Sequence, residues 1–515
     1  MFEIREMYTI DGDNVKKFSC VNGKYMLDGT TVEITENGDV LVISENYAPM
    51  KICLVFSHEF HKETLFLGDA VERGYGDLQW KACDENRSMP WYFLAYHDGK
   101  IQGFGVKTGC NSLCFWNVQK DSVTLTLDIR NGTNPVKLSS RTLKAATLVF
   151  YSAEKTAFEG ALEFCSKMCE KPRLPKTPIY GGNDWYCNYS NSTFSNILQG
   201  AERVSECAKD IAVRPYMVID DGWQLTRVNG YMGGPWRYAN SKFCDMKKMA
   251  DAIYDVGALP GIWYRPLTTA EYMPKECLWE NRWEGQVGHL DPSHPYVLEY
   301  IAGETEVLRN WGYKLLKFDY TSYDIFGRYG FQMTETPEVG NVNFYDETKT
   351  TAEIIKQLYT TIRNAATDDV AIIGCNTIGH LGAGIFELQR TGDDTSGKEW
   401  ARTKKMGVNT LAFRMCQHNR FFACDADCVG ITDLVPWKNN SLWLDVLAQS
   451  GTPLFVSVAE NSFGEIQKQE IKKAFETNVA VALSTELLQP CDWLETLTPS
   501  RWERNGQSFV YDWDI

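Results

Sequence analysis

The feature that most constrains the fold is a long series of short apolar segments separated by amphipathic ones. Eight runs have the β-rich pattern of buried strands and are too short for helices: 179–185, 214–220, 258–264, 313–319, 370–375, 385–390, 419–425 and 452–457. Between them apolar residues recur at helical spacing, as at Ile197, Ala201, Val204 and Ala208. Because strands that alternate with helices form parallel sheets, the pattern predicts a (β/α)8 TIM barrel. A doubly wound sheet is the alternative, but the sequence lacks its GxGxxG nucleotide motif.

The first 150 residues follow a different pattern, in which short β-like runs alternate with turn residues. The segments 97–100 and 130–132 have the composition of hairpin-type turns. This spacing predicts an N-terminal antiparallel β-sandwich. The intervening loop at 68–90 carries Tyr75 and Trp80, and we expect it at the surface, with contact over a neighbouring site as the alternative.

Changes in composition divide the chain into three parts. The stretch 171–178, KPRLPKTP, contains three prolines and is typical of a linker. After residue 459 an amphipathic segment is followed by two short β-like runs. We therefore expect an α/β protein with a β-sandwich domain at 1–170, a catalytic barrel at 171–458 and a small helix plus β appendix at 459–515.

The charge balance excludes several kinds of partner. The 515 residues include 52 basic and 67 acidic side chains, which gives a formal charge of -15. Such a chain repels nucleic acid and anionic membrane surfaces. It has no apolar run of about 18 residues, and its first residues lack the basic and apolar regions of a signal peptide. We expect a cytoplasmic protein that does not cross a membrane.

The cysteines and histidines give little support for a metal site. The 16 cysteines are scattered, and their closest pairs have CxxxC rather than CxxC spacing: Cys110 and Cys114, Cys165 and Cys169, Cys424 and Cys428. Reduced, buried thiols are expected in the cytoplasm. His289 and His294 have no further ligands nearby in the sequence. We therefore expect neither a metal nor a cofactor.

The fourth predicted strand, within YKLLKFDY at 313–320, contains charge in an apolar run. Lys317 and Asp319 lie two residues apart and should point to the same face of the strand, where a pair between them would keep Asp319 ionised. Barrel enzymes keep their catalytic groups at the carboxyl ends of strands, which is where Asp319 lies. The alternative is that Asp319 caps the following loop.

Carboxylates and aromatic residues also end the other predicted strands. They are Asn183, Asp184, Trp185 and Tyr186; Asp220, Asp221 and Trp223; Trp263, Tyr264 and Arg265; Cys375 and Asn376; Arg390, Asp393 and Asp394; Asp425 and Asp427. Carboxylates bind vicinal hydroxyls and indoles stack on sugar rings, so this collection favours a sugar site over a metal site.

At these positions the sequence resembles clan D glycoside hydrolases, most closely the α-galactosidases (melibiases) of glycoside hydrolase family 36. The matching pieces run in the family's order over about 280 residues: GGNDWY (181–186), VIDDGWQ (218–224), PGIWYRP (260–266), HLDPSHP (289–295), LLKFDY (315–320), IIGCN (372–376), RTGDDTSG (390–397), DADC (425–428) and SGTPLFVS (450–457). The chain departs from the family in its shorter N-terminal domain, its minimal C-terminal β region and Asn376, where glycine is common.

The resemblance implies a role for each matching residue. Asp319 is the expected nucleophile, and Asp394 the expected acid/base, because the family's Arg-x-x-x-Asp spacing from Arg390 ends there and not at Asp393. The implied sugar contacts are Asp220 and Asp221 for the 4- and 6-hydroxyls, Lys317 and Arg390 as cations, Trp185, Trp223 and Trp263 as walls, and Cys375 near the 2-substituent. A rival role for Cys375 as a thiolate nucleophile, with His380 as its base, is the alternative.

The expected function is therefore a retaining exo-α-galactosidase acting on an oligosaccharide or glycoconjugate. Its two carboxyl groups should lie about 5 to 5.5 Å apart. Within the enzyme class, an α-N-acetylgalactosaminidase and a galactosyl-transferring relative are alternatives, and outside it a non-catalytic sugar-binding protein. The sequence leaves homo-oligomerisation open.

Overall fold

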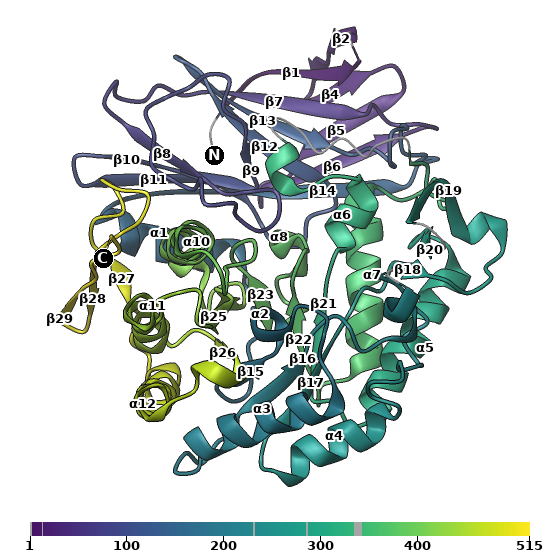
Figure 1. Ribbon diagram of the computed structural model, residues 1–515. Helices are drawn as coiled ribbons and strands as arrows, with labels where there is room; N and C mark the ends of the chain where they lie inside the picture. Colours follow the sequence, from purple (N-terminus) through teal and green to yellow (C-terminus); the bar gives the residue numbers. More distant parts are fainter. Residues whose placement is uncertain (1–2, 13, 230–231, 285–286, 334–341, 515) are drawn as a thin grey trace.

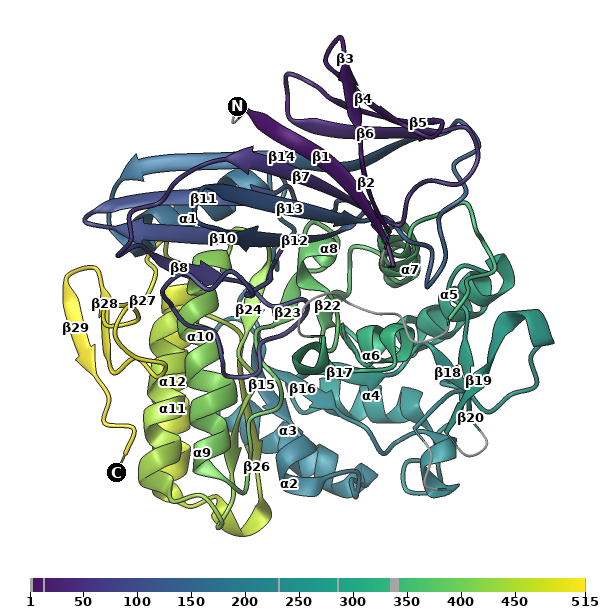
Figure 2. The same cartoon turned by 90° about the horizontal axis from the view of Figure 1, so that it is seen from above.

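The structure is a computed structural model that describes residues 3–12, 14–229, 232–284, 287–333 and 342–514. Antiparallel strands from the N-terminal part of the chain lie on one side of a parallel sheet with its surrounding helices (Figures 1 and 2). The helices and strands of each part are given below with their bounds.

Two antiparallel sheets make up the N-terminal part. The first has the order β2 (Asn14–Lys17), β1 (Ile4–Asp11), β7 (Lys51–Ser57), β13 (Ser122–Asp128), β12 (Leu113–Val118) and β9 (Met89–Pro90). The second has the order β3 (Ser19–Val21), β4 (Lys24–Leu27), β5 (Thr30–Ile34), β6 (Asp39–Ser44), β14 (Thr142–Glu154), β11 (Lys100–Val106), β10 (Tyr92–His97) and β8 (Leu65–Gly68).

Aromatic side chains join the two sheets face to face. Phe56 on β7 contacts Phe150 on β14 with ring centroids 5.6 Å apart, and Phe104 on β11 lies 6.2 Å from Trp116 on β12. The predicted hairpin turn at 97–100 is confirmed, since His97 pairs with Lys100. At the turn predicted at 130–132, Asn131 and Asn134 exchange two backbone hydrogen bonds of 2.9 Å, so a hairpin-type turn is present, although the flanking strands β13 and β14 belong to different sheets.

The parallel sheet contains all eight predicted strands and one more. Its order is β24 (Ala423–Asp425), β23 (Leu388–Arg390), β22 (Ala371–Gly374), β21 (Leu315–Phe318), β17 (Leu259–Tyr264), β16 (Tyr216–Ile219), β15 (Tyr180–Asn183), β26 (Leu454–Val458) and β25 (Cys428–Ile431). From β15 to β24 the strands follow chain order without reversal, unlike the order in doubly wound sheets.

The prediction of a closed eight-stranded barrel is corrected by this ladder. The run expected as one strand at 419–425 is followed by a second strand, and β24 pairs with β23 while β25 pairs with β26. Between them Asp427 has a φ of 73°, a left-handed conformation that interrupts a strand. The parallel sheet is therefore curled, with β24 and β25 at its two ends and no ladder between them over 423–431.

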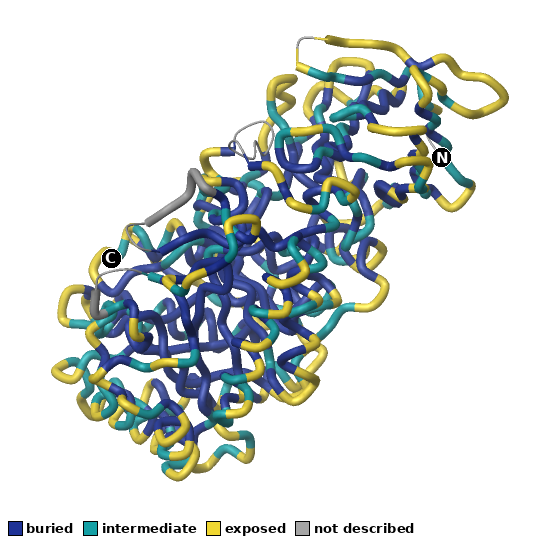
Figure 3. Tube along the Cα trace, turned by 90° about the vertical axis from the view of Figure 1, so that its right-hand side faces the viewer, coloured by how far each residue is buried: buried dark blue, intermediate teal, exposed yellow. Residues whose placement is uncertain are grey.

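The helices are α1 (Ala157–Met168), α2 (Trp185–Asn188), α3 (Phe194–Cys207), α4 (Met246–Asp255), α5 (Pro295–Asn310), α6 (Thr321–Phe326), α7 (Thr351–Ala366), α8 (Gly379–Gly382), α9 (Trp400–Thr403), α10 (Asn409–Arg414), α11 (Trp437–Ser450) and α12 (Glu465–Ala482). Helix α1 packs against β11 and β14 of the N-terminal part, and most of the others lie around the curled sheet (Figure 2). Buried residues run from the N-terminal sheets into the parallel sheet (Figure 3). Among the helices that the structure describes, none combines the length and apolar character needed to span a membrane.

Two small sheets complete the fold. One joins β18 (Thr268–Thr269), β20 (Val287–Leu290) and β19 (Leu278–Glu284) beside the parallel sheet. The other joins β27 (Gln489–Pro490), β28 (Arg501–Arg504) and β29 (Gln507–Val510) after α12, where the sequence predicted a helix and two short β-like runs.

Candidate active site

The candidate site lies where the parallel strands end, directly above an apolar cluster. That cluster includes five residues that lie on five different strands: Val218, Leu315, Ile373, Leu388 and Ala423. Because side chains alternate along a strand, the residues two positions later face the same side. They are Asp220, Lys317, Cys375, Arg390 and Asp425, and all five are buried. Packing of the apolar cluster therefore brings these polar groups together.

Lys317 does not form the ion pair that the sequence predicted. Its Nζ lies 2.7 Å from Asp220 Oδ2, so its direct partner is on β16 and not two residues along its own strand. Asn183 donates a second hydrogen bond to the same Asp220 oxygen at 2.8 Å. Lys317 acts on Asp319 only as a neighbouring charge, which lowers the pKa of Asp319.

Asp319 is held in place by three hydrogen bonds. Its Oδ1 accepts from the backbone N–H of Tyr320 at 2.7 Å and of Asn376 at 2.9 Å. Its Oδ2 accepts from Trp263 Nε1 at 3.1 Å. Burial raises the pKa of Asp319, but the charges of Arg73 and Lys317 and the hydrogen bonds from Trp263 and Tyr320 lower it, and the net pKa lies below its usual value. Asp319 is therefore ionised at neutral pH.

Asp394 has the opposite electrostatic behaviour. Its Oδ1 lies 3.3 Å from Arg390 Nη2, and 38% of its side chain is exposed. Burial raises the pKa of Asp394, and the neighbouring charges of Asp427 and Asp393 add to this, although Arg390 opposes it. Arg390 is also bound by Asp427 Oδ2 at 2.9 Å, so its charge is shared between two carboxylates.

A loop of the N-terminal part reaches into the site, which the sequence analysis considered only as an alternative. Arg73, between β8 and β9, is 7% exposed and its Nη2 lies 2.7 Å from Asp393. Its Nη1 lies 3.9 Å from both Asp394 Oδ1 and Cys375 Sγ. Asp393 is bound on its other side by Arg402 at 2.7 Å. Arg73 is thus a site residue that strand-end analysis could not find, because it belongs to no strand of the parallel sheet.

Glu72 fixes this loop to the ends of the strands. It is 2% exposed and accepts hydrogen bonds from Ser322, Asn376 and the Tyr75 hydroxyl. A fourth bond, from the backbone N–H of Gly330 at 2.8 Å, ties the loop to the segment after α6. In the sequence Glu72 and Arg73 are only two adjacent charged residues in a loop, and such residues are usually exposed, so their burial here could not be predicted.

Asp221 and Asp184 flank Asp220. Asp221 Oδ2 lies 2.9 Å from Ser190 Oγ and 3.1 Å from Arg227 Nη2, and burial raises its pKa. Asp184 Oδ1 accepts the backbone N–H of Asp220 at 2.7 Å. Burial and the charge of Asp220 raise the pKa of Asp184 to about 7. The loop that presents Asp220 is therefore supported by a carboxyl group that titrates near neutrality.

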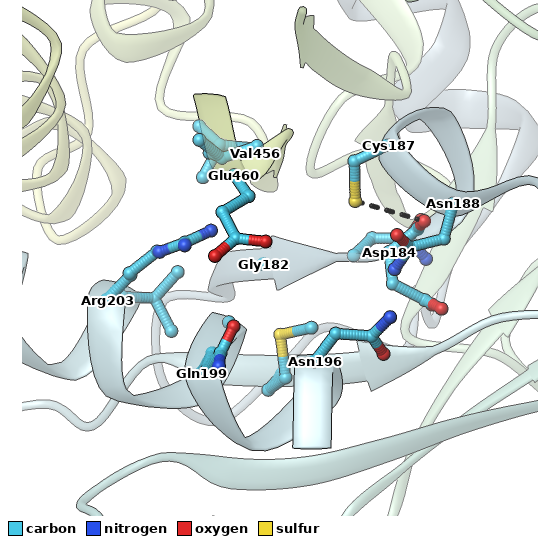
Figure 4. Close-up of a pocket in the computed structure, with 14 residues that line it drawn as sticks. Gly182, Asp184, Cys187, Asn188, Asn196, Gln199, Arg203, Val456 and Glu460 are labelled. Carbon is cyan, nitrogen blue, oxygen red and sulfur yellow. Dashed lines mark hydrogen bonds between the residues drawn. The ribbon is translucent and has the colours of Figure 1, made fainter. Parts of the chain in front are cut away.

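A cavity of about 90 Å³ lies behind Asp184, between β15, β26 and α3. Figure 4 shows Asp184 and Cys187 at one end and Arg203 and Glu460 at the other, with the Cys187 thiol directed at the Asp184 carbonyl oxygen at 3.3 Å. The cavity lies next to the predicted sugar contacts without including Asp319 or Asp394 among its lining residues.

The three predicted indoles occupy different places. Trp263 is 1% exposed and contacts Asp319 through its N–H, while Trp223 has no exposed surface and donates to the Trp263 carbonyl at 2.9 Å. Trp185 is partly exposed, and its ring centroid lies 5.4 Å from that of Tyr189. Trp185 has exposed surface that a ligand can contact, whereas Trp263 is buried against Asp319 and Trp223 supports Trp263 from behind.

The structure does not bring Cys375 and His380 together as a nucleophile and its base. Cys375 is 1% exposed, and burial together with the charge of Asp319 raises the pKa of its thiol. Its nearest cation is Arg390, with Nη1 at 3.5 Å. His380 Nε2 lies 3.1 Å from the Val106 carbonyl oxygen instead, and burial lowers its pKa to about 4. A thiolate mechanism lacks an activating base here.

Among the described residues, one group could hold a metal ion: His61, Glu63 and His97, at the edge of an N-terminal sheet. It includes no residue of the candidate site. His289, named in the sequence analysis, lies 3.5 Å from Asp324, and His294 accepts a hydrogen bond at the start of α5.

Comparison with known proteins gives fold-level similarity. No protein-family model matches the chain. An α-galactosidase from Thermus thermophilus in complex with p-nitrophenyl α-D-galactopyranoside is similar with a TM-score of 0.63 and 14% identity, over 94% of this chain and 97% of that one. The glycoside hydrolase family 36 α-galactosidase AgaA from Geobacillus stearothermophilus gives 0.62 and 14%, over 98% and 77% of the two chains.

A third structure, an α-galactosidase from Lactobacillus brevis, has a TM-score of 0.61 and 13% identity, covering 92% of this chain and 68% of that one. The resemblance drawn from the motifs is therefore confirmed by structural neighbours over most of the chain. At these identities the similarity shows the fold, and the chemistry must be argued from the residues.

Proposed function

We propose that this protein is a retaining exo-glycoside hydrolase that removes terminal α-linked galactose, or a galactose-configured sugar, from oligosaccharides or glycoconjugates. One observation carries the proposal: Asp319, after β21, and Asp394, after β23 two strands along the same sheet, have pKa values shifted in opposite directions. Two carboxyl groups whose pKa values are shifted in opposite directions can divide the roles of nucleophile and acid between them. The similar α-galactosidases, crystallised with a nitrophenyl galactoside and with stachyose, support the choice of sugar.

In the first step, Asp319 attacks the anomeric carbon while protonated Asp394 donates its proton to the leaving oxygen. The glycosidic C–O bond breaks as the ester bond to Asp319 forms. Asp319 Oδ2 accepts one hydrogen bond and Oδ1 accepts two, so Oδ2 is the freer oxygen and is assigned as the attacking atom. In the second step, Asp394 takes a proton from water as the water oxygen bonds to the anomeric carbon and the ester bond to Asp319 breaks, which releases the sugar and restores the Asp319 carboxylate.

The sugar is oriented by the groups around this pair. Asp220 and Asp221 would accept the hydroxyls at C4 and C6, with Lys317 as a donor on the same side. Trp185 would contact the ring, and Arg390 with Cys375 would line the side of the 2-substituent. A carboxyl separation of about 5 to 5.5 Å between Asp319 and Asp394 belongs to this proposal.

The test is turnover of p-nitrophenyl α-D-galactopyranoside by the wild type and matched variants. Asp319→Asn should lower kcat by at least about 10⁴-fold and still bind substrate, because the amide oxygen can keep the two backbone hydrogen bonds at the Oδ1 position, while an amide nitrogen at the Oδ2 position is not a nucleophile. Asp393→Asn is the control, since Asp393 pairs with Arg73 and Arg402. An undiminished rate in Asp319→Asn contradicts the proposal.

A panel that adds the 2-acetamido analogue separates an α-galactosidase from an α-N-acetylgalactosaminidase. Adding a sugar acceptor to the same assay distinguishes hydrolysis from transfer. If the wild type binds galactosides but turns over none of them, a non-catalytic sugar-binding role on this fold is favoured.

A further inference from the structure

A second group of chemically active side chains lies in the N-terminal part, outside the candidate active site. It consists of His61, Glu63 and His97, and we call it the His–Glu cluster. Each residue offers one imidazole nitrogen or one carboxylate oxygen, and these three atoms all lie within 4.8 Å of one another. The proposed hydrolase mechanism uses none of them, so the cluster requires an explanation of its own.

His61 and Glu63 lie on a crossover between the two N-terminal sheets. The segment 58–64 connects β7 of the six-stranded sheet to β8 of the eight-stranded sheet. The backbone N–H of Thr64 donates to the His61 carbonyl oxygen at 3.0 Å and closes a tight turn. Phe60 packs against Phe66 with ring centroids 5.0 Å apart. The backbone of the crossover is therefore anchored, although its polar side chains face solvent.

The strand ladder places His97 beside this crossover. His97 is the last residue of β10 and pairs with Lys100 across the hairpin turn. The preceding residue, Tyr96, pairs with Leu65, the first residue of β8. The imidazole rings of His61 and His97 are stacked, with centroids 4.0 Å apart and planes 18° from parallel. Because both backbones are fixed by local hydrogen bonds, the two imidazoles are brought together before any ligand binds.

The ligand atoms of the cluster have lone pairs that a cation can take. The backbone N–H of Glu63 donates to His61 Nδ1 at 3.3 Å, so a lone pair of this nitrogen faces the turn. The bond is long and exposed, and a metal ion can take this lone pair while the N–H bonds to water instead. Within the described part of the chain, the Glu63 carboxylate forms no ion pair that would compete for the cation.

The chemistry of the ligand atoms selects the ion. Two imidazole nitrogens and one carboxylate oxygen form a set that binds Zn²⁺, with water in the fourth position. Mg²⁺ and Ca²⁺ bind oxygen ligands instead. In a tetrahedral zinc site the ligand atoms lie about 3.4 Å apart, so the atoms of the cluster have to approach by roughly 1.4 Å at most. His61 and Glu63 are exposed and His97 is half-buried, so rotation of their side chains can close this gap.

We propose that the His–Glu cluster is a zinc-binding site that joins the crossover 58–64 to the hairpin between β10 and β11. The inference is independent of the proposed function. Strand β8 lies at the edge of its sheet, so a metal ion held between its first residues and the end of β10 would oppose local opening there. The sequence did not reveal the site, because strand pairing brings His97 to the other two ligands.

The test is isothermal titration of the whole protein with Zn²⁺. Thiolates also bind zinc, so the exposed cysteines are first alkylated; they are Cys20, Cys83, Cys244 and Cys491. His61→Gln and Glu63→Gln should each weaken the binding of one zinc equivalent by at least about 10-fold, which is the loss expected even for an outer-shell partner of a metal. His58→Gln and Glu59→Gln are the matched controls, because they change the same residue types in the same segment outside the cluster.

A stability measurement shows whether the metal acts on the fold. Zn²⁺ should raise the urea midpoint of unfolding in the wild type and in His58→Gln but leave that of His61→Gln in place, and EDTA should reverse the increase. Equal zinc affinities in His61→Gln and His58→Gln overturn the site. Binding of Mg²⁺ as tight as that of Zn²⁺ overturns the choice of ion. Neither measurement depends on catalysis, so an inactive hydrolase that binds zinc in this way retains the site.

Discussion

Replacement of Arg73 by methionine tests the electrostatics of the site most sharply. Arg73 Nη1 lies 3.9 Å from Asp394 Oδ1, and its charge is the largest one that lowers the pKa of Asp319. Removing a cation destabilises an ionised carboxylate, so the pKa values of both Asp319 and Asp394 should rise. The stability cost is limited, because Asp393 keeps its bond to Arg402.

The size of the shift follows from the distance and the exposure. Two unit charges about 4 Å apart interact by about 4 kcal/mol at an effective dielectric constant of 20. Because 38% of the Asp394 side chain is exposed, solvent screens the pair, and we reduce this to about 1 kcal/mol, or about 0.7 pKa unit.

The assay is the pH dependence of kcat/KM. The acid limb requires ionised Asp319 and the alkaline limb requires protonated Asp394, so both limbs should move to higher pH in Arg73→Met by about 0.7 unit or more. Arg402→Met is the control, since Arg402 shares Asp393 with Arg73. Limbs that stay in place, or that move to lower pH, refute the role given to Arg73.

Three further predictions concern neighbouring groups. The pKa of Asp184 is raised in the folded state to about 7, so the free energy of unfolding falls as pH rises from about 4 to 7. In Asp184→Asn the decrease in unfolding free energy between pH 5 and pH 8, measured by urea titration, should be smaller than in the wild type by roughly 2 to 3 kcal/mol. An equal decrease in the variant and the wild type contradicts this prediction. Lys317→Met leaves Asp220 buried without its cation and should lower the free energy of unfolding by about 3 to 5 kcal/mol in the same titrations. The double variant Lys317→Met with Asp220→Asn should recover part of this loss, and a loss below about 1 kcal/mol in Lys317→Met argues against the ion pair. Trp263→Phe removes the indole N–H that donates to Asp319, so the acid limb of the kcat/KM profile should shift to higher pH by about one unit. An acid limb that does not shift shows that this hydrogen bond does not affect the pKa of Asp319.

Local patterns were sufficient to predict the strands and to place polar residues together at the strand ends, because apolar runs and the two-residue alternation after them depend on nearby sequence alone. The partner of Lys317 could not be predicted in this way, since the strand pattern gives the face of a side chain but not which neighbouring strand offers an acceptor. The break at Asp427 was missed for a related reason. Its left-handed backbone accompanies contacts with Arg390 and Tyr186 that are distant in the sequence.

The contribution of the N-terminal loop was the hardest to predict. Glu72 and Arg73 lie in a segment without periodicity, and their partners lie about 250 to 320 residues further along the chain. Trp223 was found by the sequence analysis, but its role was ambiguous. An indole at a strand end is consistent with a ligand contact or with a buried support, and only packing distinguishes the two.

The most direct test of the central claim is the anomeric form of the sugar that is released first. Hydrolysis of p-nitrophenyl α-D-galactopyranoside followed by proton NMR should show α-galactose before mutarotation, because two displacements at the anomeric carbon through Asp319 retain its configuration. Initial release of β-galactose would contradict the covalent mechanism and the roles assigned to Asp319 and Asp394.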